Sequence, residues 1–514
     1  MPSPAVVRTY LPWDSVLLPE DRGHCCCSSC ISPQIWAFSH SNCASHPAFA
    51  MLVRRVRTGA MVKTELVETN EDYTRGPAES GCGGETGRMA VLQSRWPRHG
   101  LGESNVVHGR RLGRFASMDD RWMFETSQGT LSHQGQGNPL SHLDRILRSM
   151  EPQHPNAGAI GYIAYEAGYN WMGMEPSAAD AGTFPMPQTQ FLVFDSVRAE
   201  KPKLRPRPMD PKRSAYSDAH LSALAGSSRV HAMTDRRCYL DAVGRIKNHI
   251  RDGDIYQANY TQAFDIVTAR EGLEIYEDLA AANPAPFAAY MRFPPLHWDL
   301  DGGSVFEFPG LEIISNSPER FWKKSGPQVE TRPIKGTIAR GESQTADQEN
   351  RRQLLLSPKD RAELLMITDL ERNDLGKLAK IGSVKVQALR RVRECPSIWH
   401  LESVVTALVD PEIKWYHLMH LMFPGGSITG APKRRAMEIL RSLEPVPRGV
   451  YCGAIGWMTA NGDADFSIAI RTLVKIGKNV RVHCGGGIVA DSDPMSEYRE
   501  SLIKIAPILE CLCR

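Results

Sequence analysis

Residues 448–489, RGVYCGAIGWMTANGDADFSIAIRTLVKIGKNVRVHCGGGIV, decide the fold class. Three strand-like runs in this stretch are separated by two turn sequences, ANGD and GKN, which is the pattern of consecutive antiparallel strands. A last helix is expected to begin at Asp493 and Pro494, since a capping acid followed by proline is typical of a helix start. Consecutive strands with separate helices predict an α+β protein with antiparallel sheets.

The composition is that of a soluble globular enzyme. The chain has 514 residues, of which 42% are hydrophobic and 23% are charged. Its net charge of +3 offers no basic field, so we expect neither nucleic acid nor a membrane among its partners. No apolar run is long enough to span a bilayer, and the first residues lack a basic segment before an apolar core. We therefore expect a cytoplasmic protein.

Nine of the twelve cysteines fall into two groups. Five of them cluster near the front, at Cys25, Cys26, Cys27, Cys30 and Cys43. Their spacing lacks the ordered pairs of a zinc site, so a loosely packed or disordered tail is favoured over zinc binding. Four others are isolated in sequence and are expected to be small buried hydrophobic residues: Cys238, Cys395, Cys452 and Cys484.

Three segments are predicted along the chain. Residues 1–140 show no helical or strand period and are expected to be partly disordered. Residues 141–230 contain two buried strands and end in the Pro-rich basic connector KPKLRPRPMDPKR, an exposed loop. Residues 231–514 carry the sequence features that indicate chemistry.

Glu319 and Lys335 are placed near each other by a predicted hairpin. The segment between them turns at SGPQ and continues into the strand-like VETRPI. An amine in a dry pocket can lose its proton and act as a nucleophile, and a protonated carboxyl can donate to a leaving group. Taken alone, the two residues favour a surface ion pair, since exposed pairs are common and contribute little to stability.

Two predicted helices each present acidic residues three positions apart. Asp360 and Glu363 follow the helix start at Ser357, and Glu497 and Glu500 lie on the last helix. Such oxygen ligands suit Mg²⁺, which is often held by carboxylates together with substrate oxygens. For either helix viewed alone, the better explanation is that acids near a helix N-terminus interact favourably with the helix dipole. Only their convergence in space would make a metal site.

Polar and glycine-rich stretches complete the pattern. A helix capped by Thr234 or Asp235 is expected to precede a strand in which Gln257, Asn259 and Gln262 form either a solvated edge face or a binding surface. GGSITGAPK is not a nucleotide loop, because it lacks the Gly-Lys-Ser/Thr ending. HCGGGIV ends a strand with residues small enough to let a ligand approach the backbone.

These motifs, in this order, resemble the chorismate-utilising enzyme family. The resembling stretches are DIYQANYTQAF, SNSPERF, RPIKGT, DRAELLMITDLERNDLG, FPGGSITGAPKRRAMEIL, YCGAIGW, IAIRT, GGGIV and SEYRESLIKI, which cover roughly residues 235–510. The resemblance implies antiparallel β-sheets packed as a sandwich with helices outside. It also makes residues 231–514 the chorismate-binding catalytic region.

The resemblance also implies a cofactor and a set of binding residues. Glu363 and Glu500 match residues that bind Mg²⁺, with Asp360 and Glu497 in its outer shell. The matched substrate-binding positions are Ser427, His400, Tyr451, Arg471, Gly485, Gly486, Gly487 and Lys504. Arg471 would offer a charge-assisted pair of hydrogen bonds to the enolpyruvyl carboxylate.

Within the family, the catalytic positions resemble those of the aminodeoxychorismate synthase branch. Glu319 matches the acid that protonates the departing C4 hydroxyl, and Lys335 matches the amine that bonds to C2 before ammonia attacks C4. Anthranilate synthases carry Ala at the position of Lys335, and isochorismate and salicylate synthases carry a lysine base at that of Gln257. Anthranilate synthase and a catalytically silent subunit remain the alternatives.

The resemblance further implies a partner. The chain carries no glutaminase nucleophile segment, so ammonia is expected from a separate glutamine amidotransferase subunit or from solution. A tryptophan-binding LLES-like motif is not found before residue 150, so inhibition by tryptophan is not expected.

Overall fold

The computed structural model describes residues 52–58, 61–67, 89–93, 105–174, 186–200, 217–227, 229–300, 304–395 and 398–513. All of them fall within one compact unit, Ser45–Arg514. The predicted cysteine-rich tail and the connector 201–213 lie outside the described residues.

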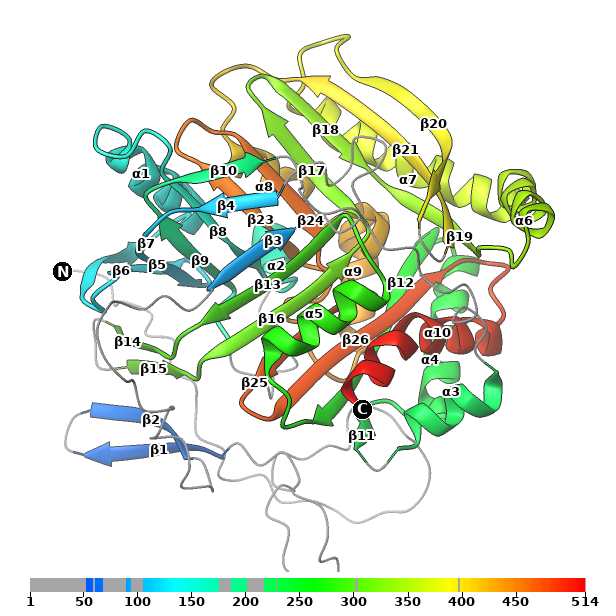
Figure 1. The fold of residues 1–514 in the computed structure, drawn as a ribbon, viewed down its shortest axis with the longest axis horizontal. Helices are drawn as coiled ribbons and strands as arrows, with labels where there is room; N and C mark the ends of the chain where they lie inside the picture. Colours follow the sequence, from blue (N-terminus) through cyan, green and yellow to red (C-terminus); the bar gives the residue numbers. More distant parts are fainter. Residues whose placement is uncertain are drawn as a thin grey trace, which may run out of the picture. The chain divides into compact units, whose positions relative to one another are not determined.

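One large sheet contains twelve of the described strands (Figure 1). In spatial order these are β19 (Ile334–Ala339), β21 (Ile398–Leu408), β18 (Gln328–Arg332), β17 (Arg320–Ser325), β24 (Ala464–Ile468), β23 (Ala454–Thr459), β8 (Gly158–Ile163), β9 (Thr189–Phe194), β5 (Arg111–Met118), β6 (Arg121–Thr126) and β7 (Leu131–Gln136). The twelfth strand, β20 (Lys385–Glu394), pairs with β21. Every pair is antiparallel.

The second large sheet contains ten described strands and is also antiparallel. Its order is β10 (Val197–Glu200), β4 (Asn105–His108), β3 (Ala90–Gln93), β13 (Phe287–Phe293), β16 (Leu311–Ser317), β25 (Thr472–Ile476), β26 (Asn479–Ile488), β12 (Gln257–Val267) and β11 (Val230–Ala232), with β22 (Gly430–Ala431) paired to β12. A small sheet joins β1 (Leu52–Thr58), β2 (Met61–Val67), β15 (Ser304–Phe308) and β14 (Leu296–Leu300).

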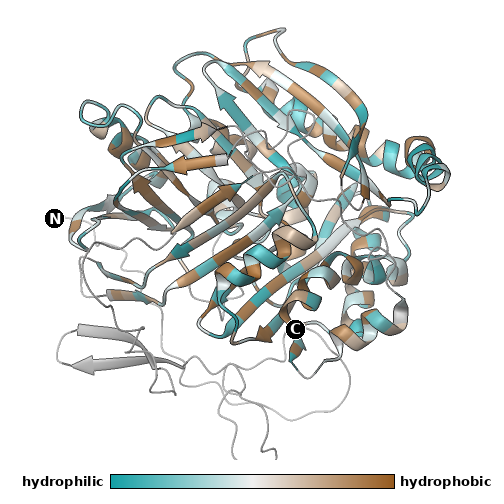
Figure 2. Ribbon diagram, in the orientation of Figure 1, coloured by the Kyte–Doolittle hydropathy of each residue, from teal (hydrophilic) through white to brown (hydrophobic). Residues whose placement is uncertain are grey.

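The two large sheets pack face to face. One core cluster contains Ile160 of β8 and Ile455 of β23 together with Met291 of β13 and Ile313 of β16, all almost fully buried. Figure 2 shows hydrophobic residues interspersed with hydrophilic ones along the strands of both sheets. Interdigitation of two inner faces is the packing of a β-sandwich, so the predicted sandwich is confirmed.

Helices cover the outer faces of the sandwich, as predicted. They are α1 (Pro139–Met150), α2 (Ala167–Trp171), α3 (Asp218–Ala225), α4 (Arg236–Arg251), α5 (Gly272–Ala282), α6 (Gln344–Leu356), α7 (Pro358–Gly376), α8 (Trp415–Met422), the 3₁₀ helix η3 (Gly426–Ile428), α9 (Lys433–Leu443) and α10 (Pro494–Leu512). Buried side chains of α3, α5 and α10 pack on the ten-stranded sheet, and those of α1 and α8 pack on the twelve-stranded one. No helix in the described stretches is long and apolar enough to cross a bilayer.

Helix starts were predictable from their caps. Asp235 caps α4, Ser357 caps α7 and Asp493 caps α10, each accepting a hydrogen bond from a backbone N–H of the first turn. The hairpin turning at Gly326 is β17–β18, as predicted. Of the isolated cysteines, Cys395, Cys452 and Cys484 are buried and Cys238 is partly exposed.

The prediction of three strands in 448–489 is wrong. The expected middle strand, 464–475, is two strands that belong to different sheets: β24 lies in the twelve-stranded sheet and β25 in the ten-stranded one. The chain changes sheet around Arg471, whose φ of 51° is rare for a residue with a side chain. A hydrophobic pattern alone does not reveal such a break, because both halves remain strand-like.

The edge-strand interpretation of the polar residues on β12 is also wrong. β12 pairs with β26 over almost its whole length and with β11 and β22 on its other side. Gln257, Asn259 and Gln262 are all buried. Buried polar groups on an internal strand need partners, so these residues favour the alternative of a binding surface.

The predicted boundaries at residues 140 and 230 remain predictions. Strands from all three predicted segments join the large sheets, since β5 lies before 140, β8 lies between the boundaries and β23 lies after them.

Replacing Ile455 by Ala should lower the free energy of unfolding by roughly 2–5 kcal/mol, because it removes packing between the two sheets. Urea unfolding followed by fluorescence measures this change. Ile381→Ala is the control, since Ile381 is fully exposed and its loss should change stability by less than about 0.5 kcal/mol. Equal effects of the two variants would contradict the assigned core.

Candidate active site

Lys335 lies on β19 at a break in strand pairing. Residues 335 and 337 face Leu401 and His400 of β21, and Gly336 between them is the extra residue of a bulge. Gly336 has a φ of 80°, and a Cβ there would lie 3.1 Å from Oδ1 of Asp360. The positive φ favours glycine here, and any larger residue would also press on the Asp360 side chain.

Lys335 is partly buried. Its Nζ donates a hydrogen bond to the carbonyl oxygen of Ser427 at 3.1 Å. Burial lowers the pKa of Lys335 below its ordinary value, and the nearby carboxylates of Glu363 and Glu319 oppose that shift. The lowered pKa increases the fraction of Lys335 that is uncharged and nucleophilic near neutral pH.

Glu319 is buried beside Lys335. Its Oε1 accepts a hydrogen bond from the backbone N–H of Ile334, the residue before Lys335, at 3.3 Å. Burial raises the pKa of Glu319, while the Ser427 hydroxyl and the positive charge of Lys335 act in the opposite direction. The surface ion pair is excluded, because Glu319 is only 4% exposed. A carboxyl that holds its proton more tightly is suited to general acid chemistry.

The glycine run of β26 leaves space beside the amine. A Cβ at Gly487 would lie 3.4 Å from Nζ of Lys335 and 2.8 Å from Nε2 of Gln257. Neither polar atom of the Gln257 side chain has a hydrogen-bond partner, although the residue is fully buried. A buried amide without partners is costly, so this is a place where a ligand atom is expected.

The other two glycines adjoin the last helix. A Cβ at Gly486 would lie 3.3 Å from Oε2 of Glu497 and 3.4 Å from Nζ of Lys504, and the carbonyl of Gly485 accepts a hydrogen bond from Lys504 at 2.9 Å. A Cβ at Gly485 itself would lie 2.1 Å from the carbonyl oxygen of Tyr260 on β12, which no side chain could tolerate.

The acidic residues of the two helices converge. Nζ of Lys359 lies 3.9 Å from Oε1 of Glu363 on α7 and 3.6 Å from Oε1 of Glu497 on α10. Glu500 pairs with Lys504 at 2.8 Å. The charge of Lys359 is favoured by Glu497, Glu363, Glu500 and Asp360, so all four carboxylates lie near one cation.

The donor set fits a magnesium ion in its chemistry. It consists of carboxylate oxygens, and Oε1 of Glu363 is buried without a hydrogen-bond partner. Among the described residues, no three His, Cys, Asp or Glu side chains are already arranged as metal ligands. Magnesium binding therefore stays a prediction.

Three further predicted binding residues are Arg471, His400 and Tyr451. The Arg471 guanidinium forms no hydrogen bond or ion pair with another described residue, and burial lowers its pKa. Nδ1 of His400 lies 2.8 Å from the Thr337 hydroxyl, whereas its Nε2 is buried without a partner. Burial and two nearby arginines hold the pKa of His400 well below its ordinary value, so the ring is neutral. Tyr451 stacks on His483, with 5.4 Å between the ring centres.

Sequence reasoning missed three charged residues around the site. Lys359 has the spacing of an ordinary helix pair with Glu363, and Glu371 lies on the buried face of the same helix. Arg393 lies on β20 and is 2% exposed. The alternation in RRVRE is the only sequence signal that one arginine of this strand points inward.

Comparison with known proteins identifies the family. The profile of the chorismate binding enzyme family matches residues 108–510. The chain belongs to this family. It is a chorismate-converting enzyme by that membership, and the predicted family and fold are confirmed.

Two curated relatives within the family are similar to nearly the same degree. Aminodeoxychorismate synthase component 1 of Klebsiella aerogenes is 37% identical over 73% of this chain and 82% of its own. Anthranilate synthase component 1 1 of Haloarcula marismortui is 36% identical over 68% of this chain and 74% of its own. The solved anthranilate synthase component I of Streptococcus pneumoniae has a TM-score of 0.61 and 22% identity, covering 85% of this chain and 95% of that one.

Glu371 is expected to make stability depend on pH. Burial raises its pKa to about 7 from an ordinary 4.5, so the folded chain binds this proton more tightly than the unfolded chain. Its contribution is therefore most favourable below pH ~4.5 and is lost as the pH rises to about 7. The free energy of unfolding should therefore fall between about pH 5 and 8 by up to about 3 kcal/mol less in Glu371→Gln than in the unmodified chain. Urea unfolding at the two pH values measures this difference.

The matched control for this experiment is Glu349→Gln, a change of an exposed glutamate on α6. The pH dependence of its stability should equal that of the unmodified chain. The same result for Glu371→Gln would contradict the tight binding of the Glu371 proton.

Proposed function

We propose that this chain is an aminodeoxychorismate synthase component I, which converts chorismate and ammonia to 4-amino-4-deoxychorismate in the para-aminobenzoate and folate route. The observation that carries the proposal is the partly buried amine of Lys335, hydrogen-bonded to Ser427 and adjacent to the buried carboxyl of Glu319. Amination at C4 through a covalent intermediate requires such an amine and an acid together.

The first step is a substitution in which Lys335 displaces the C4 hydroxyl. The uncharged amine bonds to C2, the two ring double bonds shift toward C4, and the C4–O bond breaks. Glu319 gives its proton to the departing oxygen, which leaves as water. The lowered pKa of Lys335 and the raised pKa of Glu319 both favour the reactive protonation states.

The second step reverses the electron shift with ammonia. Ammonia bonds to C4, the double bonds return to their first positions, and the C2–N bond to Lys335 breaks. The net change is replacement of a hydroxyl by an amino group at C4. Glu319, now a carboxylate, is placed to take up the excess proton of the ammonium that forms.

Substrate binding is proposed to use the unpaired groups of the site. Arg471 and Tyr451, with the backbone of Gly485–Gly487, would hold the enolpyruvyl carboxylate, and the guanidinium has no competing partner among the described residues. The neutral His400 and Ser427 would line the ring.

Magnesium is proposed to complete the site. Glu363 and Glu500 would bind it directly and Asp360 and Glu497 through water, while Lys504 would stay paired with Glu500. When bound, the ion supplies positive charge that holds the ring carboxylate of chorismate. Ammonia is proposed to come from a glutamine amidotransferase subunit, in keeping with the designation "component 1" of the Klebsiella aerogenes relative.

The rival function is anthranilate synthase. It is favoured by the 36% identity to the Haloarcula marismortui protein, close to the 37% of the other relative. In this reaction ammonia attacks C2, and pyruvate is released with a fluorescent aromatic amine. Chromatography of the products from chorismate, ammonium and Mg²⁺ separates the two functions. A silent docking subunit would bind chorismate at equilibrium and release no product.

Lys335→Ala should reduce formation of 4-amino-4-deoxychorismate by on the order of 10²-fold or more, because the covalent route is lost. The rate is measured by chromatography with saturating ammonium. Lys324→Ala is the matched control, since Lys324 is a buried lysine that likewise donates to a carbonyl, that of Gly326 at 2.7 Å. Full activity of the Lys335 variant would rule out amine catalysis at this position.

Glu363→Gln should weaken Mg²⁺ and chorismate binding together, by roughly 10-fold or more each, because one negative ligand is lost. Isothermal titration calorimetry measures both affinities. The control is Asp369→Asn, an exposed acid on the same helix. Unchanged Mg²⁺ affinity in the Glu363 variant would refute the metal assignment.

A further inference from the structure

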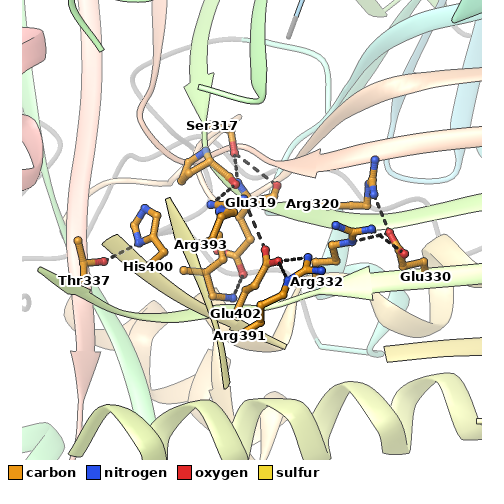
Figure 3. A network of polar contacts seen from close by, with 12 residues as sticks. Ser317, Glu319, Arg320, Glu330, Arg332, Thr337, Arg391, Arg393, His400 and Glu402 are labelled. Carbon is orange, nitrogen blue, oxygen red and sulfur yellow. Dashed lines mark hydrogen bonds and ion pairs between the residues drawn. The ribbon is translucent and has the colours of Figure 1, made fainter. Parts of the chain in front are cut away.

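We propose that Arg393, anchored by Glu402, is a positioning residue that holds the backbone next to Glu319. Nη2 of Arg393 donates a hydrogen bond to the carbonyl oxygen of Pro318 at 3.0 Å. Figure 3 shows the guanidinium between the Glu319 segment and Glu402. The inference rests on the proposed role of Glu319 as the acid of the reaction.

The pairing of two strands explains why Arg393 reaches this segment. On β20 and β21, Arg391 lies opposite Glu402 and Arg393 lies opposite His400. Residues opposite each other in an antiparallel pair point to the same face of the sheet. Arg393 therefore emerges on the face that carries His400, and its side chain extends from there toward the loop before β17.

The loop that carries Glu319 is fixed on its other side as well. The backbone N–H of Ile468 donates to the carbonyl of Glu319 at 3.1 Å. The Ser317 hydroxyl donates to the Ile468 carbonyl at 2.6 Å and accepts from the Glu319 N–H at 3.2 Å. Arg393 holds the loop from the opposite direction, so that the carboxyl has one position relative to Lys335.

Stability does not account for this buried pair. Arg393 is 2% exposed and Glu402 is fully buried, yet their closest contact is 3.7 Å, and Nε and Nη1 of Arg393 and Oε2 of Glu402 lack hydrogen bonds. When two buried charges are incompletely paired, the free energy lost by removing them from water exceeds the attraction between them. A hydrophobic pair of similar volume is often at least as stable. The pair is better explained by what Arg393 holds.

A second arginine, Arg391, holds Glu402 in place next to Arg393. Oε1 of Glu402 accepts hydrogen bonds from Nε and Nη2 of Arg391, which is about one-third exposed. If Glu402 is removed, Arg391 can turn to solvent. A double replacement of Arg393 and Glu402 therefore leaves no buried charge without a partner.

Several charged groups from different elements face Glu319. Lys335 on β19 and Arg393 on β20 favour the carboxylate, and Glu371 on α7 carries a like charge when ionised. Loss of the Arg393 charge should raise the pKa of Glu319 further. The limb of the pH–rate profile on which Glu319 loses its proton should then move to higher pH.

The test is the double variant Arg393→Met/Glu402→Leu. We expect its melting temperature to stay within about 5 °C of the unmodified chain, while kcat and kcat/KM fall together by about 10-fold or more, because an acid displaced by about 1 Å can cost on the order of 10²-fold. The limb of the pH–rate profile on which Glu319 loses its proton should also move to higher pH. Unchanged kcat with an unmoved limb would overturn the proposal.

The matched control is Arg114→Met/Glu125→Leu. Arg114 is also buried and lies opposite Glu125 on the neighbouring strand β6. It donates a hydrogen bond to a proline carbonyl, that of Pro294, at 2.5 Å. It lies on β5, on the other side of the twelve-stranded sheet's centre from β20 and β21. Its kcat and pH limb should stay unchanged, and an equal loss of kcat in both double variants would mean that only packing was disturbed.

A conservative pair keeps the proposal testable if the double variant does not fold. Arg393→Lys retains a positive donor and Arg393→Gln does not, so the lysine variant should have the higher kcat and the less shifted pH limb. Equal kcat values in these two variants would contradict the proposal that Arg393 holds the backbone next to Glu319.

The outcome is separable from the identity of the reaction. All variants are assayed on whichever product the unmodified chain releases from chorismate. An unexpected product would overturn the proposed function alone, whereas an unchanged kcat would overturn the role of Arg393 alone.

Discussion

The site depends on one constraint, which is that an amine must be held in a partly buried place next to a buried carboxyl. Lys335 meets it through the carbonyl of Ser427, and Glu319 meets it through the N–H of Ile334. Neither partner is a strong counter-charge, so burial dominates both pKa values and moves them toward the neutral forms. A full ion pair with surrounding water would leave both groups charged and unreactive.

Two irregularities in the sheets make this arrangement possible. The bulge at Gly336 interrupts the pairing next to Lys335, and the change of sheet near Arg471 places a guanidinium near His400 on the strand paired with β19. Bulges and left-handed residues are costly in regular strands and tend to occur where function requires them. The twelve-stranded and ten-stranded sheets thus supply rigid supports, while the reactive groups lie at the points where regular pairing stops.

Much of this was predictable because local chemistry determines it. Helix caps such as Ser357 and Asp493, and the hairpin between Glu319 and Lys335, follow from residue types alone. The break within 464–475 was missed because both halves are strand-like. Lys359 and Arg393 were missed for a different reason: their positions depend on contacts between distant segments, which no spacing in the sequence encodes.

The most direct test of the central claim is the mass of the intact protein after incubation with chorismate and Mg²⁺ in the absence of ammonia. Covalent catalysis predicts a gain equal to chorismate less one water, mapped by peptide analysis to the segment that contains Lys335. Product formation on later addition of ammonia should remove the added mass. Turnover of chorismate with no such gain, or a gain mapped to another lysine, would contradict the account.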